Sequence, residues 1–434
     1  MKKNKQQSIL KKMGIETLNA MQEEASLAIE HTSNSLVLSP TGSGKTMAFL
    51  LPLVQLVDDT LDEVQVLILA PSRELAIQIE TVARNMGSGL KINALYGGRS
   101  FSGDRVNIKH TPQVVVGTPG RVADHFRRKT LNPSQVKFLV LDEFDKSLEV
   151  GFEEEMSEIL EQLDRVEKKI LTSATEGVDI PDFVHFDQAT VVDYLEEGVQ
   201  KLKIKRIESP EKDKLATLEH ALRHLGNVPG IIFLNYKDSI QRVSAYLTEM
   251  KVPHGCFYGG MEQKDRERAL IKFRNGTHQL LLATDLAARG IDVPEINFII
   301  HYHLPHRAEE FTHRNGRTAR MNKKGTAYVL HWVDEELPDF IPEADVHDIS
   351  STKELLPSGW VTVFISGGRR DKISKGDIAG LCFKQGKLSK EDLGVIELKE
   401  DCAFIAVKRK KAKQMIQLVD NSRLKKKKVR FRIV

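Results

Sequence analysis

The sequence predicts an α/β protein with two tandem doubly wound parallel-sheet domains, followed by a small α+β domain. Three observations support this fold class. Short apolar segments alternate with amphipathic ones, as in βαβ units, and they form two successive sets. A run of carboxylates follows one of the apolar segments, at the place where parallel sheets hold ligands. The last part of the chain, residues 355–434, is strongly basic.

The expected strands are the short apolar runs that lie between turn formers. In the first set they are Leu36–Leu38, Val64–Ala70, Gln113–Val116, Phe138–Leu141 and Lys169–Thr172. In the second set they are Gly230–Leu234, Leu280–Ala283, Ile296–His301 and Thr326–Leu330. Two sets of strands alternating with helical segments predict two parallel sheets.

Segments rich in turn formers and acidic residues mark the expected boundaries. One lies near residues 194–199, and a second runs from residue 334 to residue 359. We therefore expect a first domain over residues 1–196, a second over 197–340, a linker over 341–356 and a C-terminal domain over 357–434.

Length and composition indicate a soluble globular protein. The 434 residues suffice for about three domains, and 41% of them are hydrophobic and 29% charged. The longest apolar stretch, residues 47–57, is too short to cross a bilayer and contains Pro52 and Gln55. The basic start lacks an apolar core, so we expect no signal peptide, no membrane partner and a cytoplasmic location.

Charge is distributed unevenly along the chain. Residues 355–434 contain 20 basic and 8 acidic side chains, a net charge of +12, which leaves −8 for residues 1–354. Such a concentration is typical of a surface that neutralises phosphates. A solvated basic tail is the alternative, although the alternation over 429–433 favours a half-buried strand.

A phosphate-binding loop is predicted at Ser39–Thr46, whose sequence is SPTGSGKT. It follows an apolar strand and precedes a helical segment, and Gly42 and Gly44 permit the tight turn that aims N–H groups at phosphates. Lys45 would reach the β- and γ-phosphates, and Thr46 would bind Mg²⁺. Ser39 stands where the general pattern has Gly, and an ordinary turn is the alternative.

The carboxylates of Asp142, Glu143 and Asp145 follow the expected strand Phe138–Leu141. At that place Asp142 can hold Mg²⁺, and Glu143 can orient or deprotonate a water molecule. The alternative is an acidic helix start, since the helix dipole alone favours Asp and Glu there. Their position about one hundred residues after Lys45 favours the catalytic interpretation.

Taken in order, these segments resemble the motifs of the DEAD-box RNA helicases. The resemblance spans residues 14–330 and implies two RecA-like domains that use ATP and Mg²⁺ to act on RNA. Its motifs are the following: 18–22 (Q motif), 39–46, 71–76, 97–98, 118–121, 142–145, 173–175, 232–235, 263–266, 283–292 and 313–320.

The resemblance implies specific roles for residues around ATP. Gln22 would read adenine, Asp292 would bind the ribose, and Arg317 and Arg320 would act as arginine fingers on the γ-phosphate. The catalytic set is then Lys45, Asp142, Glu143, Arg317 and Arg320. The remaining nucleotide-binding positions are Thr41, Gly42, Ser43, Gly44, Thr46 and Gly290.

The resemblance also implies an RNA path and a coupling device. The RNA backbone would be lined by Pro71, Arg73, Gly97, Gly98, Thr118, Arg121, Arg266 and Thr284. Ser173, Thr175 and His313 would link ATP to RNA. Closure of the two domains on ATP and RNA would bend one strand and strip a few base pairs, largely regardless of sequence.

This chain departs from the family pattern at a few positions. No aromatic residue precedes Phe49, so the upstream Phe that stacks on adenine in many relatives is missing. Phe144 replaces Ala in the acidic motif, and Asn315 and Ala319 replace Ile and Gly near the arginine fingers. Residues 176–192 are also shorter than the usual end of the first domain. Since every charged catalytic group is present, we expect hydrolysis.

The C-terminal residues resemble the RNA-binding domain of DbpA-type DEAD-box proteins, a divergent RRM with the order βαββαβ. The segment Gly367–Ile373 and the apolar segments 360–365, 393–398 and 403–407 carry this resemblance. Its central strands offer few stacking aromatics, so binding would rely on Arg369, Arg370, Lys408, Arg409 and the other basic clusters.

The resemblance implies that ribosomal RNA or pre-ribosomal particles are the partners, in large-subunit assembly. We also expect the protein to be a monomer. Two alternatives remain open from the sequence. One is an ATP-gated RNA clamp or scaffold with little strand separation, and the other is a DNA-directed helicase of the same core architecture.

Overall fold

The computed structural model describes residues 2–175, 179–196, 202–285, 296–318, 325–351 and 353–434. The described residues up to 196 form one compact unit, and those from 202 onward form another, here called units 1 and 2. Gly290, Asp292, Ala319 and Arg320, which the sequence assigns to the ATP site or its surroundings, lie outside the described residues.

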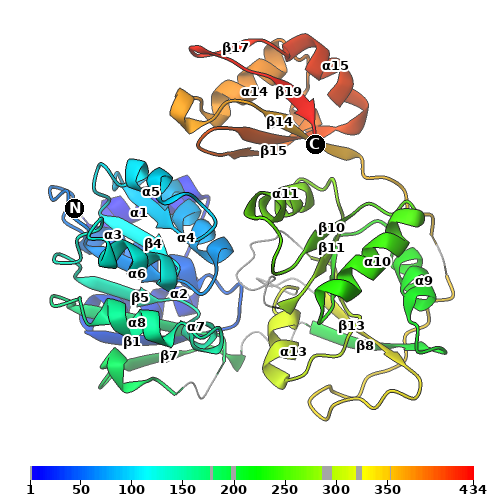
Figure 1. Ribbon diagram of the computed structural model, residues 1–434, viewed down its shortest axis with the longest axis horizontal. Helices are drawn as coiled ribbons and strands as arrows, with labels where there is room; N and C mark the ends of the chain where they lie inside the picture. Colours follow the sequence, from blue (N-terminus) through cyan, green and yellow to red (C-terminus); the bar gives the residue numbers. More distant parts are fainter. Residues whose placement is uncertain (1, 176–178, 197–201, 286–295, 319–324, 352) are drawn as a thin grey trace. The chain divides into compact units, whose positions relative to one another are not determined.

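Unit 1 contains a parallel sheet with the strand order β3-β4-β2-β5-β6-β1-β7. Figure 1 labels β4, β5, β1 and β7 of this sheet. The central strands are short apolar runs that are buried on both faces, as expected for a sheet covered by helices. The strands are β1 (Asn34–Leu38), β2 (Val66–Leu69), β3 (Ile92–Leu95), β4 (Val114–Gly117), β5 (Phe138–Leu141), β6 (Lys168–Ser173) and β7 (Thr190–Asp193).

Helices bury an apolar core against each face of this sheet. Helices α1, α3 and α4 contribute to one core, and α6, α7 and α8 contribute to the other. The helices of the unit are α1 (Lys2–Met13), α2 (Ala20–His31), α3 (Lys45–Leu56), α4 (Arg73–Asn85), α5 (Phe101–Asn107), α6 (Pro119–Arg127), α7 (Phe144–Glu149), α8 (Glu153–Leu160) and the 3₁₀ turn η1 (Asp182–Val184).

Unit 2 begins with a second parallel sheet, of order β10-β11-β9-β12-β13-β8. Apolar side chains of this sheet pack with those of helices α9 and α10 in one buried core. The elements are β8 (Leu202–Ser209), α9 (Leu215–Leu225), β9 (Gly230–Phe233), α10 (Lys237–Glu249), β10 (His254–Phe257), α11 (Gln263–Arg274), β11 (Leu280–Ala283), β12 (Phe298–His301), α13 (Ala308–Asn315) and β13 (Gly325–Trp332).

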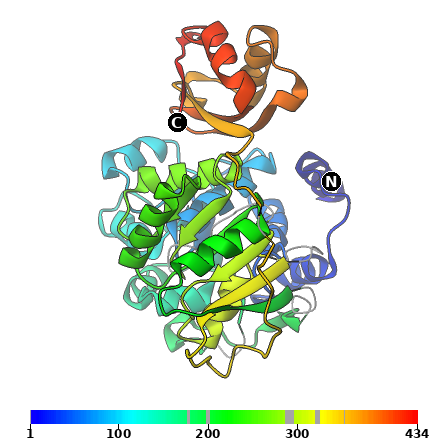
Figure 2. The same ribbon diagram turned by 90° about the vertical axis from the view of Figure 1, so that its right-hand side faces the viewer.

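The C-terminal domain is a four-stranded antiparallel sheet of order β15-β16-β14-β19, with α14 and α15 packed on one face, as Figure 2 shows. A small hairpin, β17–β18, precedes the last strand. The elements are β14 (Trp360–Ile365), α14 (Lys375–Lys384), β15 (Leu393–Leu398), β16 (Ala403–Lys408), α15 (Arg409–Val419), β17 (Arg423–Leu424), β18 (Lys427–Lys428) and β19 (Phe431–Ile433), with 3₁₀ turns η3 (Arg369–Asp371) and η4 (Lys390–Asp392).

The predicted fold class is confirmed: two doubly wound parallel sheets precede a small α+β domain. Every strand expected in the two sheets is present, with ends shifted by up to two residues. Four strands were not expected, namely β3, β7, β8 and β10, and all four lie at sheet edges. In the described part of the chain, no helix has the length and apolarity needed to span a membrane.

Candidate functional site

Three of the sequence motifs meet at one edge of the sheet in unit 1. Strands β5, β6 and β1 are neighbours, and their carboxyl ends lead into Asp142, Ser173 and the loop that starts at Ser39. The register pairs Leu38 with Ser173, and the Ser39 N–H donates to the Ser173 carbonyl at 3.1 Å. The phosphate-binding loop, the acidic motif and the Ser-Ala-Thr segment therefore share one site.

The loop between β1 and α3 has the backbone that phosphate binding requires. Gly42 and Gly44 have φ values of 87° and 96°, in the left-handed region that favours glycine. Lys45 is buried, and its ammonium group donates to the carbonyls of Ser39 and Pro40, the second at 3.2 Å. Thr41, Ser43 and Thr46 line the same loop and are partly exposed.

The Q-motif segment packs directly on this loop. Asn19 caps α2 through a capping box with Gln22, and the Asn19 side-chain amide donates to the Ser43 carbonyl at 3.0 Å. Gln22 is 5% exposed, and its amide donates to the Gly44 carbonyl at 3.3 Å. A Cβ atom on Gly44 would lie 2.3 Å from Gln22 Nε2. Both ends of the Gln22 amide have partners inside the protein, and its adenine-reading role stays a prediction.

Asp142 is held by a residue that the sequence analysis did not identify. The Thr172 hydroxyl donates to Asp142 Oδ1 at 2.5 Å and accepts a hydrogen bond from the Glu143 N–H at 3.1 Å. Thr172 is fully buried, and Asp142 is 3% exposed. Glu143 has a φ of 48°, an unusual backbone conformation for a residue other than glycine, and it is the N-cap residue of helix α7. This backbone turn presents the Asp142 and Glu143 carboxylates at the end of β5.

The environment of Asp142 disfavours its charged form. Burial, reinforced by the neighbouring Glu143 charge, raises the pKa of Asp142 to about 6. The Thr172 hydrogen bond and the Lys45 charge oppose this shift. A buried carboxylate beside a second carboxylate is stabilised by a cation, so this donor set fits a hard divalent ion such as Mg²⁺.

The end of the acidic motif is joined to the Ser-Ala-Thr segment. The Thr175 hydroxyl donates to Asp145 Oδ2 at 3.2 Å, and Ser173 Oγ accepts from the Thr175 N–H at 3.0 Å. The buried Lys146 lies 3.2 Å from the same Asp145 oxygen. The structure thus connects the two segments that the sequence assigned to hydrolysis and to coupling. Phe144, the departure from Ala, is 2% exposed and packs in the apolar core.

The predicted RNA residues of unit 1 lie at the other half of the same sheet edge. They follow β2, β3 and β4, which are neighbours. Arg73 lies against Gly97, where an added Cβ would be 3.1 Å from Arg73 Nη2. Pro71 precedes α4, and Gly98 has a φ of 86°. Thr118 is the N-cap residue of α6 and donates its N–H to the Leu95 carbonyl.

Arg121 is oriented by a buried carboxylate. Its Nε donates to Asp104 Oδ2 at 2.8 Å, and Asp104 is 1% exposed. The Phe101 ring stacks on His125 and also lies 5.0 Å from the Arg121 guanidinium. Helix α5, which carries Asp104, therefore fixes the direction of a predicted RNA-contacting arginine.

In unit 2, two of the predicted RNA residues meet at Phe257, the last residue of β10. The Arg266 guanidinium lies 4.7 Å from the Phe257 ring, and the Thr284 N–H donates to the Phe257 carbonyl at 3.3 Å. Arg266 comes from α11 and Thr284 follows β11, so the structure brings these two residues together.

A fully buried arginine, Arg314, forms hydrogen bonds with residues of the other motifs of unit 2. Its guanidinium forms two hydrogen bonds with the Asp285 carboxylate, at 2.6 and 2.5 Å, and donates to Asn235 Oδ1 at 2.8 Å and to the His303 carbonyl at 2.7 Å. His313 and Arg317, on either side of it, are 8% and 4% exposed.

The four predicted RNA-contacting residues of the C-terminal domain fall into two separate pairs. Lys408 pairs with Trp360 at the start of β14, whereas Arg369 and Arg370 follow the end of that strand. The Lys408 ammonium lies 4.1 Å from the Trp360 ring, and Arg409 Nε donates to the Ser358 carbonyl at 2.7 Å. Arg369 lies 3.7 Å from Glu400, and Arg370 is exposed.

Comparison with known proteins agrees with this arrangement. Residues 19–182 match the DEAD/DEAH box helicase family, 213–322 the helicase conserved C-terminal domain and 362–433 the DbpA RNA binding domain. The ATP-dependent RNA helicase DbpA of Bacillus subtilis is 30% identical over 90% of this chain and 89% of its own length. The chain belongs to the DbpA-type DEAD-box RNA helicases. It is therefore an ATP-dependent RNA helicase with an RNA-binding C-terminal domain.

Two further relatives support this family assignment. The ATP-dependent RNA helicase DbpA of Escherichia coli is 30% identical over 98% of this chain and 96% of its own length. A solved structure of Saccharomyces cerevisiae Dbp5 bound to RNA and ADP BeF3 has a TM-score of 0.67 and 26% identity, and it covers 76% of this chain and 88% of that chain. The helicase core and the C-terminal domain thus both have counterparts among known RNA helicases.

Proposed function

We propose that this helicase acts on ribosomal RNA during assembly of the large ribosomal subunit. The match of residues 362–433 to the DbpA RNA binding domain carries this proposal. The charge of +12 on residues 355–434, against −8 on the rest of the chain, supports it. A basic domain that recognises structured RNA would bring a helicase core with little sequence preference to one target.

In the proposed hydrolysis step, Lys45 and the loop N–H groups bind the phosphates, and Glu143 orients the attacking water. Asp142 and Thr46 are the residues that would hold Mg²⁺, which would neutralise charge on the phosphates. Arg317 would act as an arginine finger on the γ-phosphate. The roles of Gly290, Asp292 and Arg320, the cytoplasmic location and the monomeric state stay predictions.

Steady-state ATP hydrolysis by the full-length protein tests the proposal. Four conditions are compared: no nucleic acid, ribosomal RNA, an equally long structured RNA of unrelated sequence, and matched duplex DNA. The Glu143→Gln variant is the control for background hydrolysis. We expect ribosomal RNA to stimulate hydrolysis far above the unrelated RNA, and DNA to have no effect.

A charge-reversal variant tests whether the C-terminal domain provides the preference for ribosomal RNA. Lys410→Glu with Lys413→Glu changes two exposed residues of α15, and Lys212→Glu with Lys237→Glu changes two exposed lysines of the second parallel-sheet domain as the control. We expect only the first variant to lose the preference for ribosomal RNA. Equal stimulation by both RNAs in the unmodified protein would contradict the ribosomal target.

Strand separation is measured separately, with a labelled duplex that carries the ribosomal sequence. ATP-dependent release of the labelled strand is the expected result. Hydrolysis and RNA retention without release would instead favour the RNA clamp, and stimulation by DNA would favour the DNA-directed alternative.

A further inference from the structure

Unit 2 presents an exposed aromatic ring at the carboxyl edge of its parallel sheet. Tyr236 follows β9 and is the N-cap residue of α10, and it is 59% exposed. Its side chain makes no capping hydrogen bond, and among the residues that the structure describes its hydroxyl group has no hydrogen-bond partner. Tyrosine is common at binding surfaces, because it combines a large apolar ring with a polar group. The ring and the hydroxyl group of Tyr236 are therefore both available to a ligand.

The backbone immediately before this ring is held in place by Asn235. The Asn235 side-chain amide donates to the Leu304 carbonyl at 2.9 Å, and its Oδ1 accepts a hydrogen bond from Arg314 at 2.8 Å. The Asn235 N–H donates to His303 Nδ1 at 3.2 Å. Because these bonds fix the chain on which Tyr236 stands, little backbone ordering is needed when the ring binds a partner.

Two histidine rings lie beside Tyr236. The ring centroids of His303 and His306 are 6.1 and 6.4 Å from that of Tyr236. Burial, with the nearby charges of Lys214 and Arg314, lowers the pKa of His303 to about 4, so this ring is uncharged at neutral pH. His306 is exposed. The three rings form one aromatic surface at the ends of β9 and β12.

This aromatic surface adjoins the predicted RNA contacts of unit 2. Strand β9 lies between β11 and β12, and the Leu234 N–H donates to the Ala283 carbonyl at 3.0 Å. Tyr236 and Thr284 therefore leave neighbouring strands at the same edge, and such strands are about 4.8 Å apart. Arg266, which lies against the end of β10, comes next in the same line. The aromatic surface thus extends the row of predicted RNA contacts.

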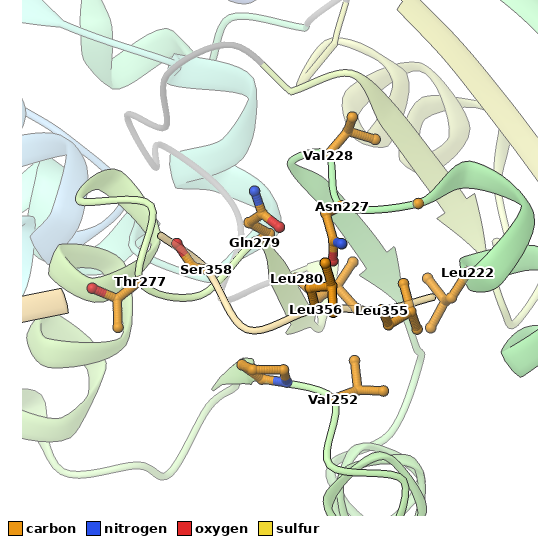
Figure 3. Close-up of a pocket in the computed structure, with 12 residues that line it drawn as sticks. Leu222, Asn227, Val228, Val252, Thr277, Gln279, Leu280, Leu355, Leu356 and Ser358 are labelled. Carbon is orange, nitrogen blue, oxygen red and sulfur yellow. The ribbon is translucent and has the colours of Figure 1, made fainter. Parts of the chain in front are cut away.

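The opposite edge of this sheet holds a small apolar cavity. Val228, Val252 and Gln279 lie just before β9, β10 and β11, and they line the cavity with Leu355 and Leu356 of the segment that enters the C-terminal domain (Figure 3). None of the twelve residues drawn in Figure 3 is charged or aromatic. Single-stranded RNA is held by cations at its phosphates and by rings at its bases, so the carboxyl edge is the one that suits it.

We propose that Tyr236 stacks on a base of the RNA strand that the helicase core binds, with His303 and His306 beside it. The contacts predicted for Arg266 and Thr284 are to the RNA backbone and read no base. A stacked ring holds one nucleotide by the face of its base, and it accepts any base because every base has a π-face. The core then binds bases as well as phosphates. This inference holds whether or not the RNA is ribosomal.

A double-mutant cycle between protein and RNA tests the proposal in the full-length protein. Unmodified protein and Tyr236→Ala are titrated with fluorescein-labelled oligo(A), in the presence of a non-hydrolysable ATP analogue and Mg²⁺. The same titrations are repeated with a series of strands in which one nucleotide at a time is abasic. Oligo(A) is a single strand that contains no folded RNA element for the C-terminal domain to recognise, so its affinity reports the core.

We expect Tyr236→Ala to weaken binding of intact oligo(A) by about 5- to 150-fold, the range for loss of one stacked base. One abasic position should weaken binding to the unmodified protein by a similar factor, and at that position Tyr236→Ala should cause little further loss. Unchanged affinity of Tyr236→Ala for intact RNA would overturn the proposal. An equal loss with every abasic strand would also overturn it, because the ring would then contact only the backbone.

Replacements that keep or remove the flat ring give an independent test. Tyr236→Phe and Tyr236→Trp should bind oligo(A) within about twofold of the unmodified protein or more tightly, whereas Tyr236→Leu should bind as weakly as Tyr236→Ala. 2-Aminopurine placed at the sensitive position should lose fluorescence on binding to the unmodified protein and to Tyr236→Phe, but not on binding to Tyr236→Leu. The opposite pattern would contradict stacking.

Two controls separate stacking from an effect on the fold. Val333→Ala removes an exposed apolar side chain of unit 2 that is 54% exposed, and it should leave oligo(A) affinity unchanged. Because Tyr236 is itself exposed, Tyr236→Leu should unfold at the same urea concentration as the unmodified protein. Loss of RNA affinity together with a lower unfolding midpoint would assign Tyr236 a structural role instead.

Discussion

Thr172 donates a 2.5 Å hydrogen bond to Asp142 and so fixes the carboxylate that begins the acidic motif. The same hydroxyl accepts the Glu143 N–H. One buried threonine therefore positions both carboxylates that are predicted to act in hydrolysis, although it lies outside the motif segments recognised in the sequence.

Thr172→Val keeps the side-chain volume and removes this hydroxyl. We expect RNA-stimulated ATP hydrolysis to fall by about 10- to 100-fold, the usual effect of removing a group that orients a metal ligand. Thr172→Ser keeps the hydroxyl and should stay near the unmodified rate. The measurement is kcat at increasing Mg²⁺, and equal activity of the Val and Ser variants would contradict the positioning role.

Asp142→Asn should stabilise unit 1 at neutral pH while it abolishes hydrolysis. Because the folded-state pKa of Asp142 is raised to about 6, its protonated form stabilises the fold at low pH, and this contribution is lost as the pH rises through 6. We expect hydrogen exchange of the β5 peptide, corrected for intrinsic rates, to be faster at pH 8 than at pH 5. In Asp142→Asn this difference should shrink, and an unchanged difference would contradict the assignment.

Arg314→Met should destabilise unit 2 by about 3–5 kcal/mol, because it leaves the Asp285 carboxylate without its partner. Arg314→Lys should recover only part of this loss, since an ammonium cannot make the paired hydrogen bonds of a guanidinium. Urea unfolding followed by tryptophan fluorescence measures the effect, because Trp332 and Trp360 both lie in unit 2. A matched change of an exposed arginine, Arg242→Met, should have little effect.

His301 should make unit 2 sensitive to acid. Burial, with a smaller contribution from the Arg314 charge, lowers the pKa of His301 to about 3, and its Nε2 lies 3.0 Å from Asn315 Oδ1. Below about pH 6.5 the unfolded chain binds a proton on this histidine, whereas the folded chain does not. The free energy of unfolding therefore falls as the pH drops from 6.5 toward 3. His301→Leu with Asn315→Leu removes both partners, and we expect a shallower loss of stability between pH 7 and pH 5. An identical pH dependence would contradict this role of His301.

The central strands of both sheets could be predicted from the sequence, and the edge strands could not. Strands such as β2, β5 and β9 are buried on both faces and are therefore continuous apolar runs. The edge strands β7 and β8 have mostly exposed or half-buried side chains, and β3 and β10 include partly exposed ones. Their sequences lack the apolar run that marks a strand.

The functional residues inside the recognised motifs could be predicted from the sequence, but most of the side chains that orient them could not. Thr172 lies beside Asp142 because β5 and β6 pair Leu141 with Leu171, a register that neither strand reveals alone. Asp104 likewise binds Arg121, 17 positions away, and inside the recognised motifs Asp285 binds Arg314, 29 positions away. The sequence carries signals for the central strands and for the motifs, whereas these pairings depend on how separate elements meet in space.

Helix α11 carries Arg266 near its start and Arg274 at its end. At 1.5 Å per residue these two positions are about 12 Å apart along a rigid rod. Arg274 lies 3.0 Å from Glu397 of the C-terminal domain, so this rigid helix fixes the distance between a predicted RNA-contacting arginine and that domain.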